Sequence, residues 1–501
     1  MSDVIVIGSG PNGLVAANVL ARAGLDVLVL ESKMEPGGAV RTAETTLPGF
    51  KHDVGAGFFP FGRHSPAFVE LDLEGAGVKW RHAPIDSAHP ALDGSCGVLA
   101  RDLDRTAELM GEDGEAWRRI ASWYASVADR LLPALLETFP AVRRGLSIGP
   151  ATMVRLASVA LSSGRAFAER TFKTEAARRV IPALALHTDV GPDDALGAIV
   201  GFMLAVTGSH GGFQVPEGGA GMITRALCAR LREAGGHVHV GARVEYVLTE
   251  GSRAVAVRTS SGEEIRAKHA IVADTAAPTL FLELCDQRSV PSTVLDAMRR
   301  FRRGFGTFKV DWALAGPVPW LAEPAREAAV VHTGESLDDL ARFTREVREG
   351  RLPEDPYLVI GQQSILDATR APAGKHTLYA YSRVPGEIAG GYDAAARARY
   401  LERIEARIEA LAPGFRERIL ARVAFTPTDL EAMNENLLGG DLGGGTADIT
   451  NQLFLRPLFP YFRYRTPLRG LYLGSSYAHP GAGVHGMCGY NAARAVLADL
   501  R

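Results

Sequence analysis

Cysteine is scarce in this sequence, which has only 4 cysteines among 501 residues and no CxxC pair. They are Cys96, Cys228, Cys285 and Cys488, and they lie far apart. This spacing excludes a zinc ribbon and a redox-active dithiol, because both need closely paired cysteines. So sparse a set also argues against the disulfide framework of a small secreted protein.

Net charge and long hydrophobic runs are lacking as well. The formal net charge is −2, whereas a dedicated nucleic-acid binder would carry a basic stripe. The longest mainly apolar stretch, residues 195–206, is shorter than the roughly 20 residues of a membrane-spanning helix. No export signal precedes the first strand-like run. We therefore expect a cytoplasmic protein of about two or three domain-sized units, without a nucleic-acid partner.

Glycine, by contrast, is abundant. The chain has 55 glycines, about 11% of its residues, against a usual share of ~7%. They follow neither a collagen period nor a linker pattern, and they gather in short packets along the chain. Because glycine lets a backbone come close to a ligand, these packets are candidate binding segments.

The first packet, Gly8 to Gly13, reads GSGPNG and matches the GxGxxG pattern. Residues 3–8 form a β-branched run typical of a buried parallel strand. Residues 14–23 have helical composition, and residues 27–30 form a second buried strand. The packet therefore lies at the turn of a βαβ unit, which is the context that the dinucleotide-binding fingerprint requires.

Each glycine of this fingerprint has a distinct expected role. Gly8 permits the tight turn, Gly10 lets the backbone approach a pyrophosphate, and Gly13 lets the helix pack close to the strand. The helix N-terminus supplies free N–H groups and the positive end of a dipole. Glu31 closes the second strand. It is expected to accept hydrogen bonds from the adenosine ribose and to repel the 2′-phosphate of NADP.

Two further packets extend the candidate site. Residues 35–42 contain a glycine pair followed by Arg41, which brings bare backbone and a cation near an anionic ligand. At this spacing the segment resembles the second signature of the flavin amine oxidase and phytoene desaturase superfamily, and residues 52–59 resemble the next one. The resemblance implies that the first segment runs under the FAD pyrophosphate and that the second lies beside the isoalloxazine ring.

The most specific resemblance lies in residues 464–493, which read YRTPLRGLYLGSSYAHPGAGVHGMCGYNAA. This strand, glycine turn and helix are similar to the C-terminal signature of phytoene desaturase-related oxidoreductases. The nearest branch is the one named for a pyridine nucleotide-disulphide oxidoreductase domain, although no CxxC supports disulphide chemistry. His485 stands where carotenoid desaturases usually have proline, which favours this less characterised branch. A free helix N-terminus here would stabilise the negative charge of reduced flavin.

Motif and resemblance together define an expected FAD site. Only one nucleotide fingerprint is present, so no NAD domain is expected. In the family, the residue that matches Val244 contacts the adenine end through its backbone. The expected FAD-binding residues are Gly8, Gly10, Asn12, Gly13, Glu31, Ser32, Gly38, Ala39, Arg41, Gly57, Val244, Ser475, Ser476, Gly486 and Met487.

Candidate catalytic and substrate-lining residues follow from the same resemblance. Lys309 resembles the lysine that faces flavin N5 through a water in amine oxidases, and a strand lysine at the surface is the alternative. His485, beside the flavin edge, would donate a hydrogen bond or act as an acid or base, and a structural histidine is the alternative. Phe58, Phe59 and Tyr461 are expected to line the substrate cavity, with a plain aromatic core as the alternative. No cluster predicts a metal site.

The remaining sequence suggests a second, inserted domain. Residues 103–210 read as mostly helical, with 116–136 and 174–186 as clear helices, and His187 is expected to be a packed or capping residue. Residues 237–273 read as a small β meander followed by a buried strand.

We therefore predict an α/β fold with a discontinuous, Rossmann-type FAD-binding domain of the glutathione-reductase and amine-oxidase kind. An α+β substrate domain is inserted into it. The FAD-binding domain is expected to comprise residues 1–85, 214–290 and 430–501, and the substrate domain residues 86–213 and 291–429.

The leading hypothesis is an FAD-dependent oxidoreductase that desaturates a C–C bond of a small apolar or amphipathic substrate, with oxygen or a quinone as acceptor. The alternatives are a flavin amine oxidase, an isomerase or saturase of a double bond, and a flavin-free lipid-binding protein similar to Rab GDP-dissociation inhibitors. The intact glycine packets and Glu31 argue against the last. A carotenoid-like substrate would require peripheral membrane docking by an apolar patch. Substrate identity and oligomeric state stay open.

Overall fold

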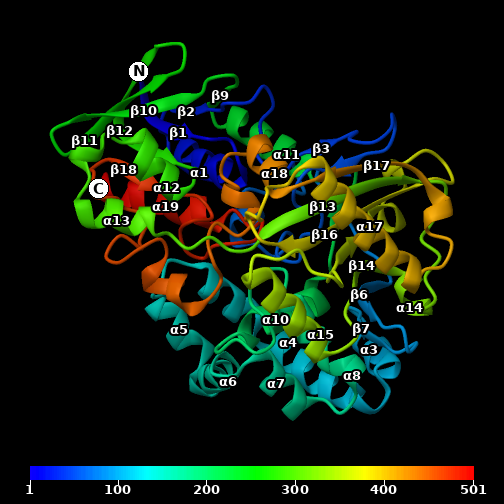
Figure 1. Ribbon diagram of the computed structural model, residues 1–501. Coiled ribbons are helices and arrows are strands. Elements are labelled where there is room, and N and C mark those ends of the chain that lie inside the picture. Colours follow the sequence, from blue (N-terminus) through cyan, green and yellow to red (C-terminus); the bar gives the residue numbers. More distant parts are fainter.

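The computed structural model describes all 501 residues and contains two seven-stranded sheets (Figure 1). The first sheet is built around the N-terminal strand β1, which runs parallel to β2 on one side and to β12 on the other. β9 extends the sheet beyond β2, and β18 pairs with β12. These parallel strands are β1 (Ser2–Ile7), β2 (Val27–Leu30), β9 (His237–His239), β12 (Glu264–Ala273) and β18 (Leu471–Leu473).

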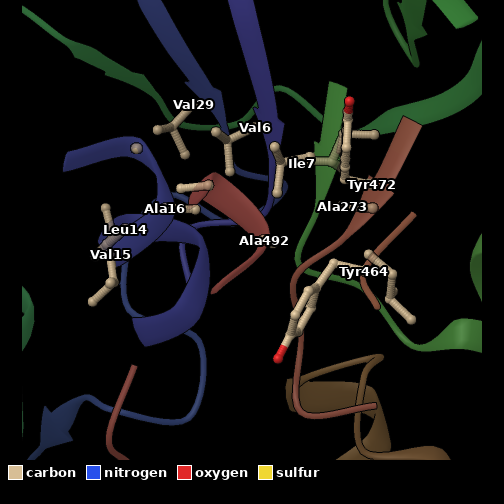
Figure 2. Close-up of a cluster of buried hydrophobic side chains, with 14 of the residues drawn as sticks. Val6, Ile7, Leu14, Val15, Ala16, Val29, Ala273, Tyr464, Tyr472 and Ala492 are labelled. Atoms are coloured by element: carbon tan, nitrogen blue, oxygen red, sulfur yellow. The ribbon is translucent and has the colours of Figure 1, made fainter. Parts of the chain in front are cut away.

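Three helices form one layer against this sheet. α1 (Pro11–Arg22) contacts β1 and β2, and it also contacts α11 (Gly221–Glu233) and α19 (Met487–Asp499). Figure 2 shows side chains of β1, β2, α1 and α19 meeting in the core between them. The parallel sheet and its helices have the Rossmann-type arrangement that the sequence predicts, because the buried β-branched runs leave both faces apolar.

A glycine sets the distance between α1 and α19. A Cβ atom built on Gly489 would lie 1.8 Å from the carbonyl oxygen of Asn12. No side chain therefore fits at residue 489 while the two helices stay in place. This contact joins the first glycine packet to the last one, although they lie at opposite ends of the chain.

The β meander differs from the sequence prediction in two places. β12 is one continuous strand, and its first half pairs with the antiparallel strands β10 (Val244–Glu250) and β11 (Arg253–Thr259) while its second half enters the parallel sheet. The buried run 270–273 is therefore the end of a longer strand. The sequence places β9 in the meander, but in the structure β9 pairs with β2. The same run of residues could form either strand, so only its pairing partner distinguishes the two positions.

The second sheet has the strand order β17-β13-β16-β15-β14-β6-β7 and is antiparallel except between β14 and β6. Its core strand β13 is buried along its whole length, and α17 (Ala394–Leu411) packs its apolar side chains against this sheet. The strands are β6 (Ile85–Pro90), β7 (Cys96–Leu99), β13 (Gly306–Leu314), β14 (Ala328–His332), β15 (Val359–Gly361), β16 (His376–Val384) and β17 (Ile419–Phe425).

A helical region lies between β7 and α11 in the sequence. The predicted helix 174–186 is two short helices, because Pro182 has no N–H to donate to the carbonyl of Arg178. The helices of the region are α3 (Leu103–Leu109), α4 (Gly114–Leu136), α5 (Val142–Ile148), α6 (Pro150–Ala160), α7 (Gly164–Thr171), α8 (Glu175–Arg178), α9 (Val180–Ala185) and α10 (Ala198–Gly211).

Shorter elements connect these parts. None of the helices is both long and apolar enough to cross a membrane. The first sheet takes strands from residues 2–30, 237–273 and 471–473, and the second from 85–99 and 306–425. The domain boundaries given above stay a prediction. The connecting elements are β3 (Thr42–Ala43), β4 (His52–Asp53), β5 (Trp80–Arg81), β8 (Val215–Pro216), α2 (Pro66–Glu70), α12 (Ala277–Thr279), α13 (Ser292–Arg299), α14 (Glu323–Arg326), α15 (Leu337–Arg348), α16 (Gln363–Leu366) and α18 (Pro427–Met433).

Candidate functional site

One large cavity, of about 820 Å³, begins at the carboxyl ends of β1, β2 and β12 and extends to the second sheet and the helical region. Ligands of open α/β sheets bind at this edge. Most of the expected FAD-binding residues lie in its wall, whereas Gly13, Ser475, Gly486 and Met487 lie outside it. Those in the wall are Gly8, Gly10, Asn12, Glu31, Ser32, Gly38, Ala39, Arg41, Gly57, Val244 and Ser476.

The glycines of the fingerprint pack against a carboxyl group that the sequence analysis did not single out. Asp274 follows β12, and its Oδ2 accepts a hydrogen bond of 2.9 Å from the N–H of Gly13. A Cβ atom on Gly10 would lie 2.6 Å from the same oxygen, and one on Gly13 would lie 2.3 Å from the carbonyl oxygen of Gly8. The motif therefore makes room for Asp274 as well as for a ligand. Its position directly after a buried strand was the available signal.

Asp274 also has unusual electrostatics. Its carboxyl is buried at the N-terminal end of α1 and lines the cavity. Burial raises the pKa of Asp274, the hydrogen bond from Gly13 lowers it and the nearby Glu31 raises it, so that the pKa is about 7. Near neutral pH this group therefore carries a proton part of the time, beside the expected diphosphate position.

Glu31 is held by the backbone around it. Its Oε2 accepts hydrogen bonds from the N–H of Ser9 at 3.0 Å and from the Ser9 hydroxyl at 2.5 Å. Its Oε1 accepts from the N–H of Lys33 at 2.8 Å and from the Ser32 hydroxyl at 3.3 Å. A carboxylate offers about four acceptor sites. The long Ser32 contact is thus the one that a ribose hydroxyl would replace.

The second glycine packet lies directly against the first. A Cβ atom on Gly38 would lie 3.3 Å from the Cα of Gly10. Arg41 donates from Nε to the carbonyl oxygen of Gly38 at 2.9 Å, and it faces the cavity beside Ala39. Bare backbone and a fixed guanidinium thus occur together at the cofactor end of the cavity, as the packet predicts.

His485 lies in the cavity wall and caps the helix behind it. Its Nδ1 accepts a hydrogen bond of 3.0 Å from the N–H of Met487, so the proton of the neutral ring is on Nε2. That Nε2 is buried without a partner, and burial lowers the pKa of His485 to about 4. The sequence predicts a free N-terminus for α19, but one of its N–H groups is bound by His485. The Nε2–H of the imidazole is thus left without an acceptor in the protein.

Lys309 lies outside the main cavity. It lines a small neighbouring cavity together with Gly38, Ala39, Arg41 and Gly55. Its Nζ lies 2.5 Å from Oδ1 of Asp311, whose carboxylate is fully buried. The amine is thus occupied by an ion pair, and its predicted role toward flavin N5 stays a prediction.

Not all of the expected aromatic residues line the cavity. Phe58 and Phe59 line the cavity, and the ring of Phe58 lies 6.2 Å from that of Tyr379. Tyr461 does not line it. Tyr461 is half-buried and packs against the core of the first sheet, in a run in which Phe459 is exposed and Phe462 and Tyr464 are buried.

A chain of five hydrogen-bonding side chains leads from the cavity wall into the protein. Tyr381 Oη lies 3.2 Å from Nδ1 of His187, and both residues line the cavity. Nε2 of His187 lies 2.7 Å from Nε2 of His332. Nδ1 of His332 lies 3.0 Å from the Ser87 hydroxyl, which lies 2.9 Å from Nε2 of His89. We call this the Tyr–His chain.

All members of the Tyr–His chain are neutral. Desolvation lowers the pKa of His187 to about 3, and it lowers the pKa of His332 and of His89 well below the usual value. Each neutral imidazole and each hydroxyl is both donor and acceptor, so the chain can be polarised in either direction. No local pattern predicts this chain, because its members come from segments far apart, and the sequence indicates only a packed or capping role for His187.

The far part of the cavity is apolar. Two carboxyls, Asp189 and Asp441, also belong to its wall. Asp189 accepts from the N–H of Ala447 at 2.8 Å and from the Thr446 hydroxyl, and desolvation raises the pKa of Asp189. Each carboxylate oxygen of Asp189 thus already accepts one hydrogen bond from the protein. The apolar wall comes from α4 and α10 and their neighbours, and it includes Leu132, Leu135, Leu136, Leu196, Ile199, Val200, Met203, Leu204 and Phe213.

The residues at the cofactor end fit a flavin dinucleotide. Three residues of the cavity wall each have a buried polar atom without a partner in the protein: Asn12 Oδ1, Thr275 Oγ1 and His485 Nε2. Such atoms need a ligand to satisfy them. Together with the glycine cradle, the helix N-terminus and Glu31, they provide for a diphosphate, a ribose and a ring edge.

Glu31→Ala is expected to lower the affinity for FAD at least about tenfold, because it removes the ribose acceptor and frees the loop at Ser9. The measurement is the flavin-to-protein absorbance ratio of the purified protein, followed by titration of apoprotein with FAD. Glu263→Ala, at an exposed turn, is the matched control. Unchanged FAD affinity in Glu31→Ala would contradict the ribose role.

Comparison with known proteins agrees with this geometry. The family model described as "Flavin containing amine oxidoreductase" matches residues 12–497. The chain is 27% identical to mouse (Mus musculus) pyridine nucleotide-disulfide oxidoreductase domain-containing protein 2, covering 100% of this chain and 94% of that protein. It is also 27% identical to hydroxyneurosporene desaturase of Cereibacter sphaeroides, covering 99% and 98%.

Among solved structures, an oxidoreductase from Methanosarcina mazei is similar to this one. The TM-score is 0.64 at 18% sequence identity, and the match covers 99% of each chain. This likeness confirms the predicted fold class, and the family match confirms the predicted FAD cofactor. The chain belongs to the flavin-containing amine oxidoreductase family and is an FAD-dependent oxidoreductase.

Proposed function

We propose that this protein removes two hydrogens from neighbouring carbons of a small apolar or amphipathic substrate, and that oxygen or a quinone takes the electrons. The apolar far wall of the cavity, formed by α4 and α10, is the observation that carries this proposal. An apolar substrate would gain from burial against these side chains, whereas a polar one would lose its hydration without compensation.

The same wall argues against an amine substrate. A protonated amine placed there needs a carboxylate or another acceptor, since an unpaired buried ammonium is strongly unfavourable. Asp189 accepts from Thr446 and Ala447, and the three backbone N–H groups of Gly304, Gly443 and Gly445 bind the carboxylate of Asp441. A relative named for hydroxyneurosporene desaturation also supports a C–C bond as the target.

Bound FAD would supply the hydride acceptor. The second hydrogen leaves the neighbouring carbon as a proton, and the Tyr–His chain provides a place for it. Tyr381 Oη would receive this proton while its own proton passes to Nδ1 of His187. Arg383 lies with its guanidinium carbon 5.2 Å from the Tyr381 ring and opposes the rise in the pKa of Tyr381 that burial causes. The charge of Arg383 therefore makes it easier for the Tyr381 hydroxyl to give its proton to His187.

The test uses the purified, FAD-loaded protein without oxygen. Acyclic isoprenoid polyenes, limonene and simple alkylamines serve as probes, and flavin bleaching is followed together with mass analysis of the products. We expect bleaching and loss of two hydrogens with an isoprenoid probe and none with the amines. Bleaching by amines alone, with peroxide released in air, would overturn the proposal.

His187→Phe is the variant that tests the proton path. It should slow the bleaching by roughly 100-fold or more, since it removes a proton acceptor, while FAD content stays unchanged. The matched control is His237→Phe, on the exposed edge of β9. Equal rates in both variants would show that the Tyr–His chain has only a structural role.

A further inference from the structure

Exposed apolar side chains are concentrated on one part of the surface. Of the 18 exposed large hydrophobic side chains, ten lie within residues 130–163 and 449–463, about a tenth of the chain. Scattered exposed leucines need no explanation, but a contiguous apolar patch marks an interaction site. We call these ten the apolar face: Leu135, Val142, Leu146, Met153, Val154, Leu161, Ile449, Phe454, Leu455 and Phe459.

The two segments form one continuous surface. α5 contacts both α4 and α6, and Figure 1 shows α5 and α6 at one edge of the molecule. The ring of Phe139, between α4 and α5, lies 4.8 Å from that of Phe454, which lies 5.2 Å from that of Phe462. Phe459 stacks on Phe462 at 6.2 Å. Aromatic contacts thus join the helical segment to residues 449–463.

The helices of this face are amphipathic with their apolar sides outward. Val154 and Leu161 lie seven residues apart on one side of α6 and its end, and Val142 and Leu146 lie four apart on α5. Leu146 is 78% exposed and Leu161 is 75% exposed. A helix that turns such a stripe away from the core needs an apolar environment outside the chain.

The apolar face reaches the wall of the cavity. Leu135 and Ile449 are exposed and also belong to the cavity wall. Ala160 and Leu453, their neighbours on the two segments, line the cavity as well. A substrate that leaves the apolar part of the cavity at this point therefore meets an apolar surface and not bulk water.

The charges around the face have one dominant sign. Residues 130–163 contain four arginines and one acid, Glu137, and residues 449–463 contain two arginines and no acid. The chain as a whole has a net charge of −2, so the positive excess is local. Of these arginines, Arg456 is buried and Arg144 pairs with Glu137 at 2.7 Å; the others are Arg130, Arg143, Arg155 and Arg463.

We propose that the apolar face docks on an anionic lipid surface and that the substrate passes directly between the bilayer and the cavity. Arginines at the rim attract anionic headgroups while leucine, valine and phenylalanine side chains enter the acyl boundary. A second copy of this chain fits the face less well, because a symmetric contact would bring the arginines of both copies together. The passage of substrate rests on the proposed function, whereas the docking does not.

The experiment measures binding of the FAD-loaded protein to sedimented vesicles. One set contains phosphatidylcholine with phosphatidylglycerol, and the other contains phosphatidylcholine alone. We expect binding to the anionic set. The double variant Leu146→Ser/Leu161→Ser should weaken it at least about tenfold, because two inserted side chains are lost. Arg143→Glu/Arg144→Glu should remove the preference for the anionic set.

The matched control is Val69→Ser/Leu321→Ser, which changes two side chains, each 63% exposed, outside the apolar face. It should bind vesicles like the original protein, and flavin absorbance reports the fold of every variant. No binding to either set, or equal binding of the double variant and the control, would overturn the docking. A dimer that Leu146→Ser/Leu161→Ser dissociates, without vesicle binding, would assign the face to a second copy. Vesicle binding together with turnover of amines would leave the docking intact and overturn the proposed substrate.

Discussion

Arg370→Met is expected to lower the free energy of unfolding by about 3–5 kcal/mol. Arg370 is fully buried between two carboxylates. Its Nη1 lies 2.9 Å from Oδ2 of Asp53, and its Nε lies 2.9 Å from Oδ2 of Asp367. Methionine fills a similar volume but leaves both acids buried without their cation, and such a group is far more costly than the ion pair itself.

Loss of Arg370 should also affect the cofactor end of the molecule. Asp53 also accepts from the N–H of Ala220 at 2.8 Å, and Asp367 accepts from the N–H of Gly218 at 2.7 Å. The cluster thus fixes the loop before α11, and it joins β4 to the segment between β15 and β16. Arg370→Met should therefore loosen FAD retention as well as stability, which flavin release during thermal unfolding would report.

Arg288→Met is the control, because Arg288 pairs with Asp286 in the same way but is 91% exposed. It should leave the unfolding transition unchanged, since exposed ion pairs contribute little. The double variant Asp367→Asn/Arg370→Met should recover part of the loss by removing one unpaired charge. Equal transitions for Arg370→Met and Arg288→Met would show that the buried cluster does not hold the fold together.

Local sequence patterns were sufficient to predict the strand–turn–helix unit at the cofactor end of this molecule. The strand at Val27–Leu30 was predicted with its observed bounds, and the glycine packet Gly8–Gly13 lies at a strand-to-helix turn as predicted. Both depend on neighbours in the sequence: a buried strand is a β-branched run, and a glycine fingerprint needs only its own spacing. Glu31 could be singled out from the same βαβ unit, because it directly follows the second strand.

The parts that could not be predicted depend on pairing across the chain. The Tyr–His chain joins Ser87, His187, His332 and Tyr381 through the second sheet and the end of α9, and no single segment carries its pattern. The ion pair between Lys309 and Asp311 is a different case, because both residues lie on the same strand, and the role of Lys309 toward the flavin stays a prediction. A strand places residues i and i+2 on one face, so this pairing could have been considered from the sequence.

FAD binding is expected to take up a proton at Asp274 and to weaken as the pH rises above about 7. The pKa of Asp274 is raised by burial to about 7 in the protein without cofactor, from an ordinary 3.8. A bound diphosphate adds negative charge at the N-terminus of α1 and raises this pKa further, so the complex keeps the proton that the free protein loses. The dissociation constant should therefore increase by up to about tenfold per pH unit above pH ~7.

The other groups around this carboxyl do not titrate in the same way. Burial raises the pKa of Cys488 to about 12 and lowers the pKa of His485 to about 4, so both stay neutral from pH 6 to 9. Glu31 lies at the end of the neighbouring strand, and its charge adds to that of ionised Asp274. Asp274→Asn should make FAD affinity independent of pH in this range, as measured by quenching of FAD fluorescence with apoprotein.

A variant of Asp86 can distinguish an effect of pH on cofactor binding from an effect of pH on stability. Burial raises the pKa of Asp86 to about 7 as well, but its carboxyl accepts from the N–H of Phe213 and does not line the cavity. A carboxyl with a raised folded-state pKa contributes most to stability below its unfolded-state pKa, and this contribution is lost as the pH rises to about 7. Both aspartates therefore destabilise the fold at high pH, and Asp86→Asn and Asp274→Asn should both flatten the pH dependence of unfolding. Only Asp274→Asn should flatten the pH dependence of FAD binding. If Asp86→Asn flattens the pH dependence of FAD binding equally, the effect arises from the stability of the fold and not from a charge beside the diphosphate.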